Sequence, residues 1–349
     1  MAETLIRRAL SSLPVGITRV WLRRILLANL IAQVGIVLTG GIVRLTGSGL
    51  GCPTFPQCVP GSYIPVVNQA EGIHKYIEFG NRTLTSVVSV LAIAALLAVR
   101  RSVRSGQGGR RLLILGTVPF IGVLAQALIG GVTVLTQLNP TVVAVHFLVS
   151  MGLIAGSTLL LLVAVPMEDA APMEDAAPAA SSTQGVPTQG VLTRRLAGAA
   201  GVTAAVVLML GTTVTGSGPH SGDAEDPNRF GFDIQLVTKL HSGFVWLFVG
   251  LVVAIVVTLA RTAGPVEAGR WSTALLLVTL AQGAIGYLQY ALGVPAWLVG
   301  VHMLGASLFV ITTTGTVYAV LRRRGAEHPL PTTTGATTGP VSGEDLVSR

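Results

Sequence analysis

The sequence has 349 residues, of which 51% are hydrophobic and only 11% are charged, and its mean hydropathy is +0.70. So little polar surface excludes a soluble globular protein of this length. The net charge of +8 does not indicate a nucleic-acid partner, because the arginines form short clusters between apolar runs, as in the cytoplasmic loops of membrane proteins.

Eight apolar runs are long enough to cross a hydrocarbon layer about 30 Å thick. They lie near residues 25–43, 78–99, 112–135, 141–165, 196–214, 237–260, 272–291 and 296–320. The sequence therefore predicts an all-α integral membrane protein with eight transmembrane helices. We expect the first run to be retained, because it lacks the cleavage pattern of a signal peptide. The basic clusters share one side if the helices alternate, which predicts a multi-pass plasma-membrane protein with both termini in the cytoplasm.

A low-complexity segment divides the chain. From Pro166 the hexapeptide Pro-Met-Glu-Asp-Ala-Ala is copied in tandem and then followed by Ser, Thr, Gln and Gly. Such a segment cannot bury a core, so we expect 166–195 to be a disordered cytoplasmic linker. The predicted order is a cytoplasmic segment 1–24, a four-helix bundle 25–165, the linker, a second four-helix bundle 196–320, and a disordered tail 321–349.

The two halves share a repeated pattern around one histidine. Ala125, Gln126, Ile129, Gly130 and His146 recur as Ala281, Gln282, Ile285, Gly286 and His302, each 156 positions later. A fixed spacing over this length indicates a duplicated unit. Because each bundle has an even number of helices, both copies should have the same orientation in the membrane.

The histidines of the second half suggest a haem site. His241 and His302 are expected near the same ends of two helices of one bundle, where two imidazoles can bind both faces of a haem iron. The alternative is that each histidine forms only a hydrogen bond between helices. The matching depth of the pair, and the repetition of one member as His146, favour haem ligation.

Polar residues gather before the second span. His74, Glu78 and Arg82 are spaced by four residues, with Asn81 beside them, so they share one face if the helix begins at His74. A carboxylate there could move protons or stabilise positive charge on a substrate. An ordinary ion pair of little energetic value is an equal alternative.

Cys52 and Cys58 are the only cysteines and lie in the first loop expected outside the membrane. We expect a disulfide there, acting either as a structural link or as a thiol pair that exchanges electrons. Five cations are also expected on this side, and they could pair with haem propionates or simply extend to the membrane interface: Arg44, Lys75, Arg82, Arg229 and Lys239.

Taken together, these motifs resemble the haem A synthase family of eight-helix membrane enzymes over roughly residues 25–320. The segments that carry the resemblance are Gly40 to Cys52, with Cys58, and Ile77 to Arg82, together with the three histidines. The resemblance implies conversion of haem O to haem A, through hydroxylated intermediates, for cytochrome oxidase. It implies a haem b between His241 and His302, the substrate haem in the first bundle, Glu78 and Arg82 at the reaction site, and a redox-active pair Cys52 and Cys58.

One departure concerns the first haem site. Family members commonly have histidine where this chain has Asn81, so His146 lacks its usual partner. The pattern resembles an actinobacterial branch that also has Asn at this position. His74 and Asn81 are both candidate cofactor-binding residues. His74 could compensate for the missing ligand, but it is seven residues from Asn81, about 10 Å along a helix, and cannot simply occupy the same place. A second external cysteine pair is absent, and His220 lies in that loop.

Other readings and partners stay open. A dihaem electron carrier would use the same histidines but would not need Glu78 or the cysteines, whereas a transporter would hold no haem. Haem O synthase and oxidase assembly factors are candidate partners, and a homo-oligomer is also compatible with the sequence.

Overall fold

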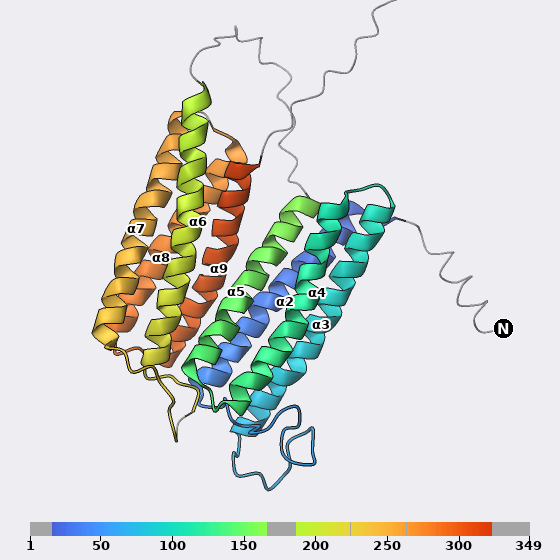
Figure 1. Ribbon diagram of the computed structural model, residues 1–349, viewed down its shortest axis with the longest axis vertical. Coiled ribbons are helices and arrows are strands. Elements are labelled where there is room, and N and C mark those ends of the chain that lie inside the picture. The colour runs from blue at the N-terminus through green and yellow to red at the C-terminus, as the bar shows by residue number, and fades with distance from the viewer. Residues whose placement is uncertain (1–15, 166–185, 224, 263, 323–349) are drawn as a thin grey trace, which may run out of the picture.

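The computed structural model describes residues 16–165, 186–223, 225–262 and 264–322, and within them it is all-helical (Figure 1). Its eight helices are each long and apolar enough to cross a membrane, which confirms the predicted fold class. They are α2 (Arg19–Leu45), α3 (His74–Arg104), α4 (Arg110–Leu135), α5 (Pro140–Ala164), α6 (Val186–Ser217), α7 (Ile234–Arg261), α8 (Val266–Ala291) and α9 (Ala296–Leu321).

The helices begin and end close to the predicted spans, with three informative differences. Helix α2 begins at Arg19, where the Thr18 side chain caps the first turn. Helix α3 extends back to His74, as the shared-face hypothesis requires. Helix α6 begins at Val186, so the last part of the predicted linker is helical, whereas 166–185 lies outside the described residues. Hydropathy identifies only the stretch that matches the membrane, and these helices continue beyond it.

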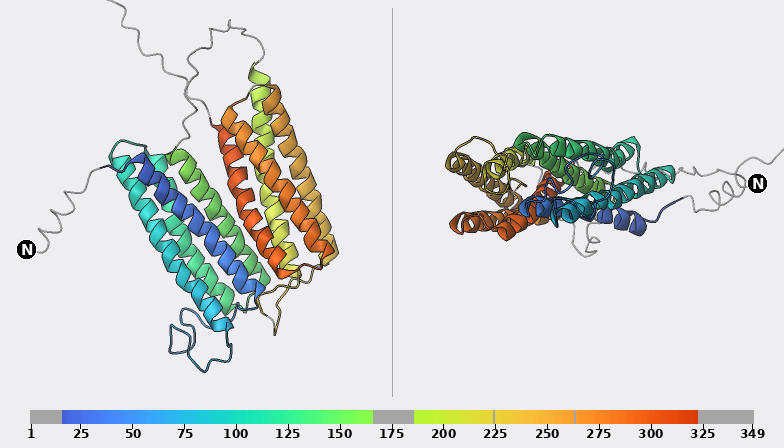
Figure 2. Two further views of the ribbon diagram at one scale, coloured as in Figure 1. Left: turned by 180° about the vertical axis from the view of Figure 1, so that it is seen from behind. Right: turned by 90° about the horizontal axis from the view of Figure 1, so that it is seen from below.

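Figures 1 and 2 show two four-helix bundles side by side. In the first bundle each of α2 to α5 contacts its two neighbours in the ring, and in the second bundle α6 to α9 do the same. Contacts between the bundles come from α2 and α5 on one side and α6 and α9 on the other. The arrangement agrees with the duplication inferred from the histidine pattern.

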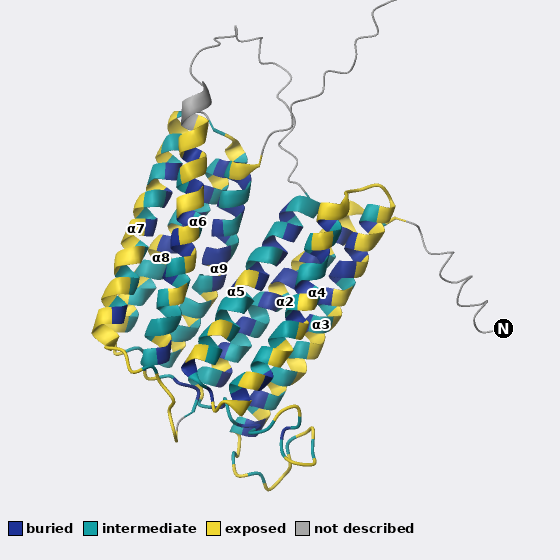
Figure 3. Cartoon of the chain, viewed as in Figure 1, coloured by how far each residue is buried: buried dark blue, intermediate teal, exposed yellow. Residues whose placement is uncertain are grey.

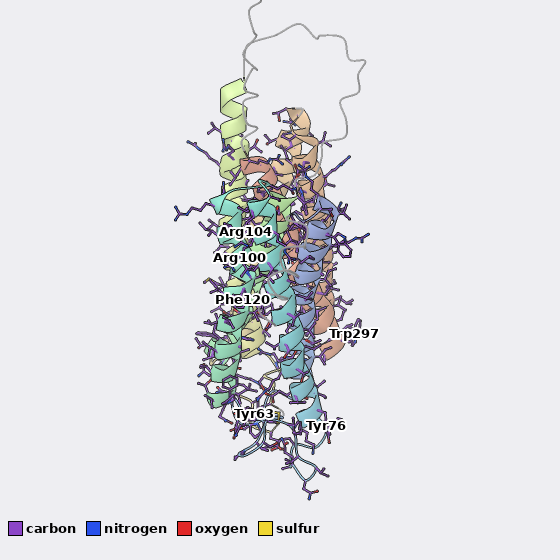
Figure 4. All side chains as sticks on the ribbon, turned by 90° about the vertical axis from the view of Figure 1, so that its right-hand side faces the viewer. Tyr63, Tyr76, Arg100, Arg104, Phe120 and Trp297 are labelled. Atoms are coloured by element: carbon purple, nitrogen blue, oxygen red, sulfur yellow. A yellow bond between two sulfur atoms is a disulfide. The ribbon has the colours of Figure 1, made fainter. Side chains whose placement is uncertain are left out.

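The two ends of the molecule differ in chemistry. Helix starts and ends place Arg23, Arg100, Arg104, Arg261 and Arg322 at one end, which we call the arginine end. The loop that contains Cys52 and Cys58 lies at the opposite end, the disulfide end, together with the loops that follow α4, α6 and α8. Figure 4 shows this separation, with Arg100 and Arg104 far from Tyr63 and Tyr76.

The interior is apolar, and most of the outer surface requires lipid. The largest core cluster joins α2 and α5 to helices of the second bundle and includes Leu30, Met151, Phe248 and Phe309. Only 17% to 39% of the most apolar window of each helix is buried inside the protein. Intermediate and exposed residues therefore lie along the helices of both bundles (Figure 3), as expected when hydrocarbon is the solvent.

Candidate functional site

Glu78 lies at the start of α3, buried under the α2–α3 loop. Its carboxylate accepts a hydrogen bond at 2.6 Å from the backbone N–H of Cys52, and its second oxygen accepts from the Arg82 guanidinium at 2.6 Å. The residue is only 5% exposed. Burial of a carboxylate is costly unless charge and hydrogen bonds compensate for lost water, and here both its oxygens have partners.

Arg82 fixes the loop on α3. Beyond its ion pair with Glu78, it donates to the carbonyls of Cys52 at 2.6 Å, Thr54 at 3.0 Å and Gln57 at 3.3 Å. Only the planar fork of a guanidinium can reach so many acceptors at once. The equal alternative of a weak surface ion pair does not describe this contact, because the carboxylate is buried and the guanidinium organises a whole loop.

Cys52 and Cys58 form a disulfide, as predicted, and both residues are completely buried. Gln69 covers this loop by donating to the carbonyl of Gly51 at 2.6 Å. Gly51 itself allows a close approach, since a Cβ there would overlap the His74 carbonyl of α3. The carboxylate, the guanidinium and the disulfide thus form one compact unit, which we call the disulfide unit: Cys52, Cys58, Glu78 and Arg82.

His74 and Asn81 have different surroundings. His74 Nδ1 is hydrogen-bonded to the Ser48 hydroxyl at 2.7 Å, so its ring faces the α2–α3 loop. Asn81 lies deeper, where its side-chain oxygen accepts from Thr39 of α2 at 2.7 Å. His74 therefore does not occupy the place of Asn81, as their spacing predicted.

His241 and His302 lie within one bundle at matching depth. Each lies about 10 Å from the start of its helix at the disulfide end, and α7 and α9 belong to the same ring of four helices. His241 Nδ1 is 3.1 Å from the carbonyl of Val207 on α6. Since a carbonyl only accepts, Nδ1 carries the proton and Nε2 keeps a free lone pair, which is the form that binds a metal.

His146 is the counterpart of His302 in the first bundle. Gln126 donates to the backbone carbonyl of His146 at 2.9 Å, and Gln282 donates to that of His302 at 3.0 Å. Gln126 additionally donates to the Ser150 hydroxyl. The sequence repeat is therefore also a repeat of contacts, with a glutamine of one helix tied to the histidine of the next.

The cations expected near propionates are mostly engaged with backbone carbonyls. Lys75 is 3% exposed and donates to the carbonyls of Val66 and Val67. Arg44 donates to the carbonyls of His220 at 2.6 Å and Thr215 at 3.0 Å, joining the ends of the two bundles. Arg229 donates to Pro219 at 3.3 Å. Among the described residues, Lys239 is the only one of these five cations whose side chain has no hydrogen-bond or ion-pair partner, and it is exposed.

His220 belongs to the loop that joins the bundles. A ring nitrogen lies 2.9 Å from the carbonyl of Val294, in the loop between α8 and α9. The neighbouring loop residue Gly222 accepts a hydrogen bond from Gly49 at 2.8 Å, which connects the first loop to this one. His220 therefore helps to connect the loop after α6 to the loop between α8 and α9.

The sequence matches the model of one known family. A family model described as "Cytochrome oxidase assembly protein" matches residues 23–221, which is more than half of the chain. The chain belongs to this cytochrome oxidase assembly family. The resemblance to haem A synthases deduced from the motifs is thereby confirmed at the level of the family.

Curated proteins that are similar to this chain are named heme A synthase. The relative from Geobacillus kaustophilus (strain HTA426) is 32% identical over 113 residues, 32% of each chain. That from Bacillus pumilus (strain SAFR-032) is 34% identical over 135 residues, 38% of this chain and 41% of the relative. That from Lysinibacillus sphaericus (strain C3-41) is 33% identical over 149 residues, 42% of this chain and 46% of the relative. Each alignment spans less than half of the relative.

The histidine surroundings fit a haem. Each ring lies against a glycine of a facing helix. A Cβ at Gly130 would lie 3.3 Å from Cε1 of His146, and one at Gly211 would lie 3.3 Å from Cε1 of His241. A Cβ at Gly286 would lie 3.7 Å from Cε1 of His302. The Nδ1 atoms of His146 and His302 are buried without a partner among the described residues. In the same part of the chain no three His, Cys, Asp or Glu residues form a group that could hold a metal ion.

Some positions were visible in the sequence, but their contacts were not predicted. Gln126 and Gln282 stand out in the repeat, each twenty residues before its histidine, and this constant spacing was the available signal for a helix-to-helix contact. Thr39 and Ser48, which hold Asn81 and His74, had no such signal. Hydroxyl residues are common in membrane helices as local hydrogen-bond donors.

Proposed function

We propose that this protein is a haem A synthase, which oxidises a methyl group of haem O to a formyl group through hydroxylated intermediates. The observation that carries the proposal is an asymmetry between the bundles. The contact between a glutamine and a histidine is present in both bundles, whereas the disulfide unit is present in the first alone. The spacing of 160 that relates Asn81 to His241 relates Glu78 to Thr238. One bundle that reacts and one that only holds a haem explain this difference, and a symmetric dihaem carrier does not.

The second bundle would hold a resident haem b. His241 and His302 would bind opposite faces of the iron, and the hydrogen bond from His241 to Val207 would fix the ring in the metal-binding tautomer. Bound there, the haem would supply one-electron redox chemistry. Gln282 would keep α8 and α9 in register around the ligand, since it holds the His302 carbonyl.

The first bundle would bind haem O as the substrate. His146 would provide an axial ligand, whereas Asn81, already engaged with Thr39, offers only a weak neutral amide. A haem held firmly from one face can exchange more readily than one held from both. This difference suits a substrate that must enter and a product that must leave.

The disulfide unit would act on the substrate periphery. Oxidation of a methyl group removes protons and creates positive character at the reacting carbon, and the Glu78 carboxylate can accept a proton or stabilise that charge. Arg82 would hold the carboxylate in place, since it bonds Glu78 and the loop together. A change in the redox state of Cys52 and Cys58 would directly affect the Glu78 carboxylate, because the backbone N–H of Cys52 donates a hydrogen bond to it.

The arginine end would face the cytoplasm and the disulfide end the outside. Arginine-rich ends of membrane helices stay inside, and a disulfide persists in an oxidising compartment. Both termini would then be cytoplasmic in the plasma membrane. Haem O synthase and oxidase assembly factors are the partners that such a reaction calls for.

The pigments of the purified protein test this proposal. The full-length protein is purified from cells that make haem O, its haems are extracted into acid acetone, and they are identified by chromatography and mass. Haem O, its hydroxylated forms or haem A beside haem b would support the synthase. Haem b alone would favour an electron carrier, and no haem would leave the histidines as packing residues.

A further inference from the structure

The two bundles differ where a haem would meet the lipid. On the outer surface of the second bundle, Trp246 of α7 donates a hydrogen bond to the Tyr287 hydroxyl of α8 at 3.0 Å. Both residues face outward, with exposures of 60% and 57%. This pair links α7 to α8 close to the level of His241 and Gly286. We call the line along which two neighbouring helices meet their seam, and two large side chains of the helices themselves close the α7–α8 seam.

The corresponding positions of the first bundle carry small residues. The repeat spacing of 156 that relates His146 to His302 relates Gly131 of α4 to Tyr287. The spacing of 160 that relates Asn81 to His241 relates Ser86 of α3 to Trp246. Ser86 is exposed and Gly131 is buried. At these two positions the first bundle therefore lacks the bulky pair that links α7 to α8.

Phe55 takes the place in front of Gly131. A Cβ at position 131 would lie 2.5 Å from Cδ1 and 2.6 Å from Cε1 of the Phe55 ring. The carbonyl just before it, that of Thr54, accepts from Arg82 of α3 at 3.0 Å. The ring thus rests on α4 while its backbone is attached to α3. It belongs to the Cys52–Cys58 loop and is 37% exposed.

We propose that the α3–α4 seam is a lateral entrance from the membrane for a haem substrate with a long apolar tail, and that Phe55 is its gate. The inference rests on the proposed function, since it needs a haem that exchanges at His146. A substrate dissolved in lipid can enter through a seam without crossing water. Displacing one loop-borne ring is easier than separating packed helices. A resident haem needs no such entrance, and Trp246 with Tyr287 closes the equivalent seam.

Two variants test the gate through different residues. Phe55→Ala removes the ring, and Gly131→Ala adds a Cβ where the ring lies, which displaces it. The full-length proteins are placed in lipid nanodiscs, haem b is added as the probe, and the growth of the Soret absorbance that is lost in His146→Ala is followed. We expect both variants to load about fivefold faster, because less apolar burial opposes opening. The matched control, Tyr287→Ala, should leave this rate unchanged.

A larger side chain at position 55 distinguishes the proposed gate from a general loosening of the fold. Phe55→Trp enlarges the ring and should slow loading, a result that loosening of the fold would not produce. Equal rates in the wild type, Phe55→Ala and Gly131→Ala would overturn the gate while leaving the proposed function intact. A wild type with no uptake that depends on His146 would overturn the gate together with the substrate site.

Discussion

Glu78 accepts a hydrogen bond from the backbone N–H of Cys52 at 2.6 Å, which joins a buried carboxylate to a disulfide loop. The loop is not a free connection between helices, since Arg82 holds it at three carbonyls. A change in the disulfide would therefore reach the carboxylate through one hydrogen bond, the one that the Cys52 N–H donates to Glu78. This coupling exists in the first bundle only, and it separates the functions proposed for the two bundles.

Replacement of Glu78 by glutamine should abolish most of the reaction. The amide is nearly the same size but cannot take a proton or balance positive charge, so we expect a loss of about 10²-fold or more in haem A formation. The ratio of haem A to haem O in membranes measures it. Glu267→Gln, which removes a carboxylate paired with Arg322 at the arginine end, is the matched control and should retain activity.

Replacement of Arg82 by lysine should behave almost like its replacement by alanine. An ammonium group keeps the charge but cannot reach the Glu78 carboxylate and three carbonyls together. We expect the loop to detach in both variants, with faster protease cleavage between residues 52 and 73 and a similar loss of haem A. A lysine variant with wild-type cleavage and activity would show that charge alone is sufficient.

Removal of the disulfide should destabilise the protein moderately. Closing so short a loop is worth about 2 kcal/mol, so Cys52→Ser, Cys58→Ser and the double variant should all denature at a lower temperature in detergent, and by the same amount. A double variant much less stable than either single one would mean that the thiols contribute separately from the bond.

Replacement of Gln282 by leucine should weaken the second haem site selectively. The change removes the donor to the His302 carbonyl, a hydrogen bond worth about 1 kcal/mol. We expect faster loss of haem b to apomyoglobin and a shifted midpoint potential. Gln126→Leu is the matched variant in the first bundle, and it should leave haem b retention unchanged.

Much of this architecture could be predicted from the sequence. Apolar runs identify membrane helices because lipid requires them, and the constant spacing of Gln126 with His146 and Gln282 with His302 revealed the duplication. The different positions of His74 and Asn81 along α3 also followed from helical rise alone.

The contacts of the loops could not be predicted in the same way. The sequence left open whether Arg44 and Lys75 pair with propionates or extend to the membrane interface, and it did not predict that they donate to the backbone carbonyls of His220 and Val66. Backbone acceptors leave no mark in the sequence, since every residue has a carbonyl. The contact between Phe55 and Gly131 could not be predicted either, because it forms only when two segments that are distant in the sequence meet.

The most direct test of a reacting first bundle and a resident haem in the second compares two histidine variants. His146→Ala and His302→Ala are purified from cells that make haem O, and their extracted pigments are identified by chromatography and mass. We expect His146→Ala to retain haem b and lose haem O and its oxidised forms, and His302→Ala to lose the tightly bound haem b. The same pigment loss in both variants, or a normal six-coordinate haem b spectrum in His302→Ala, would contradict this assignment.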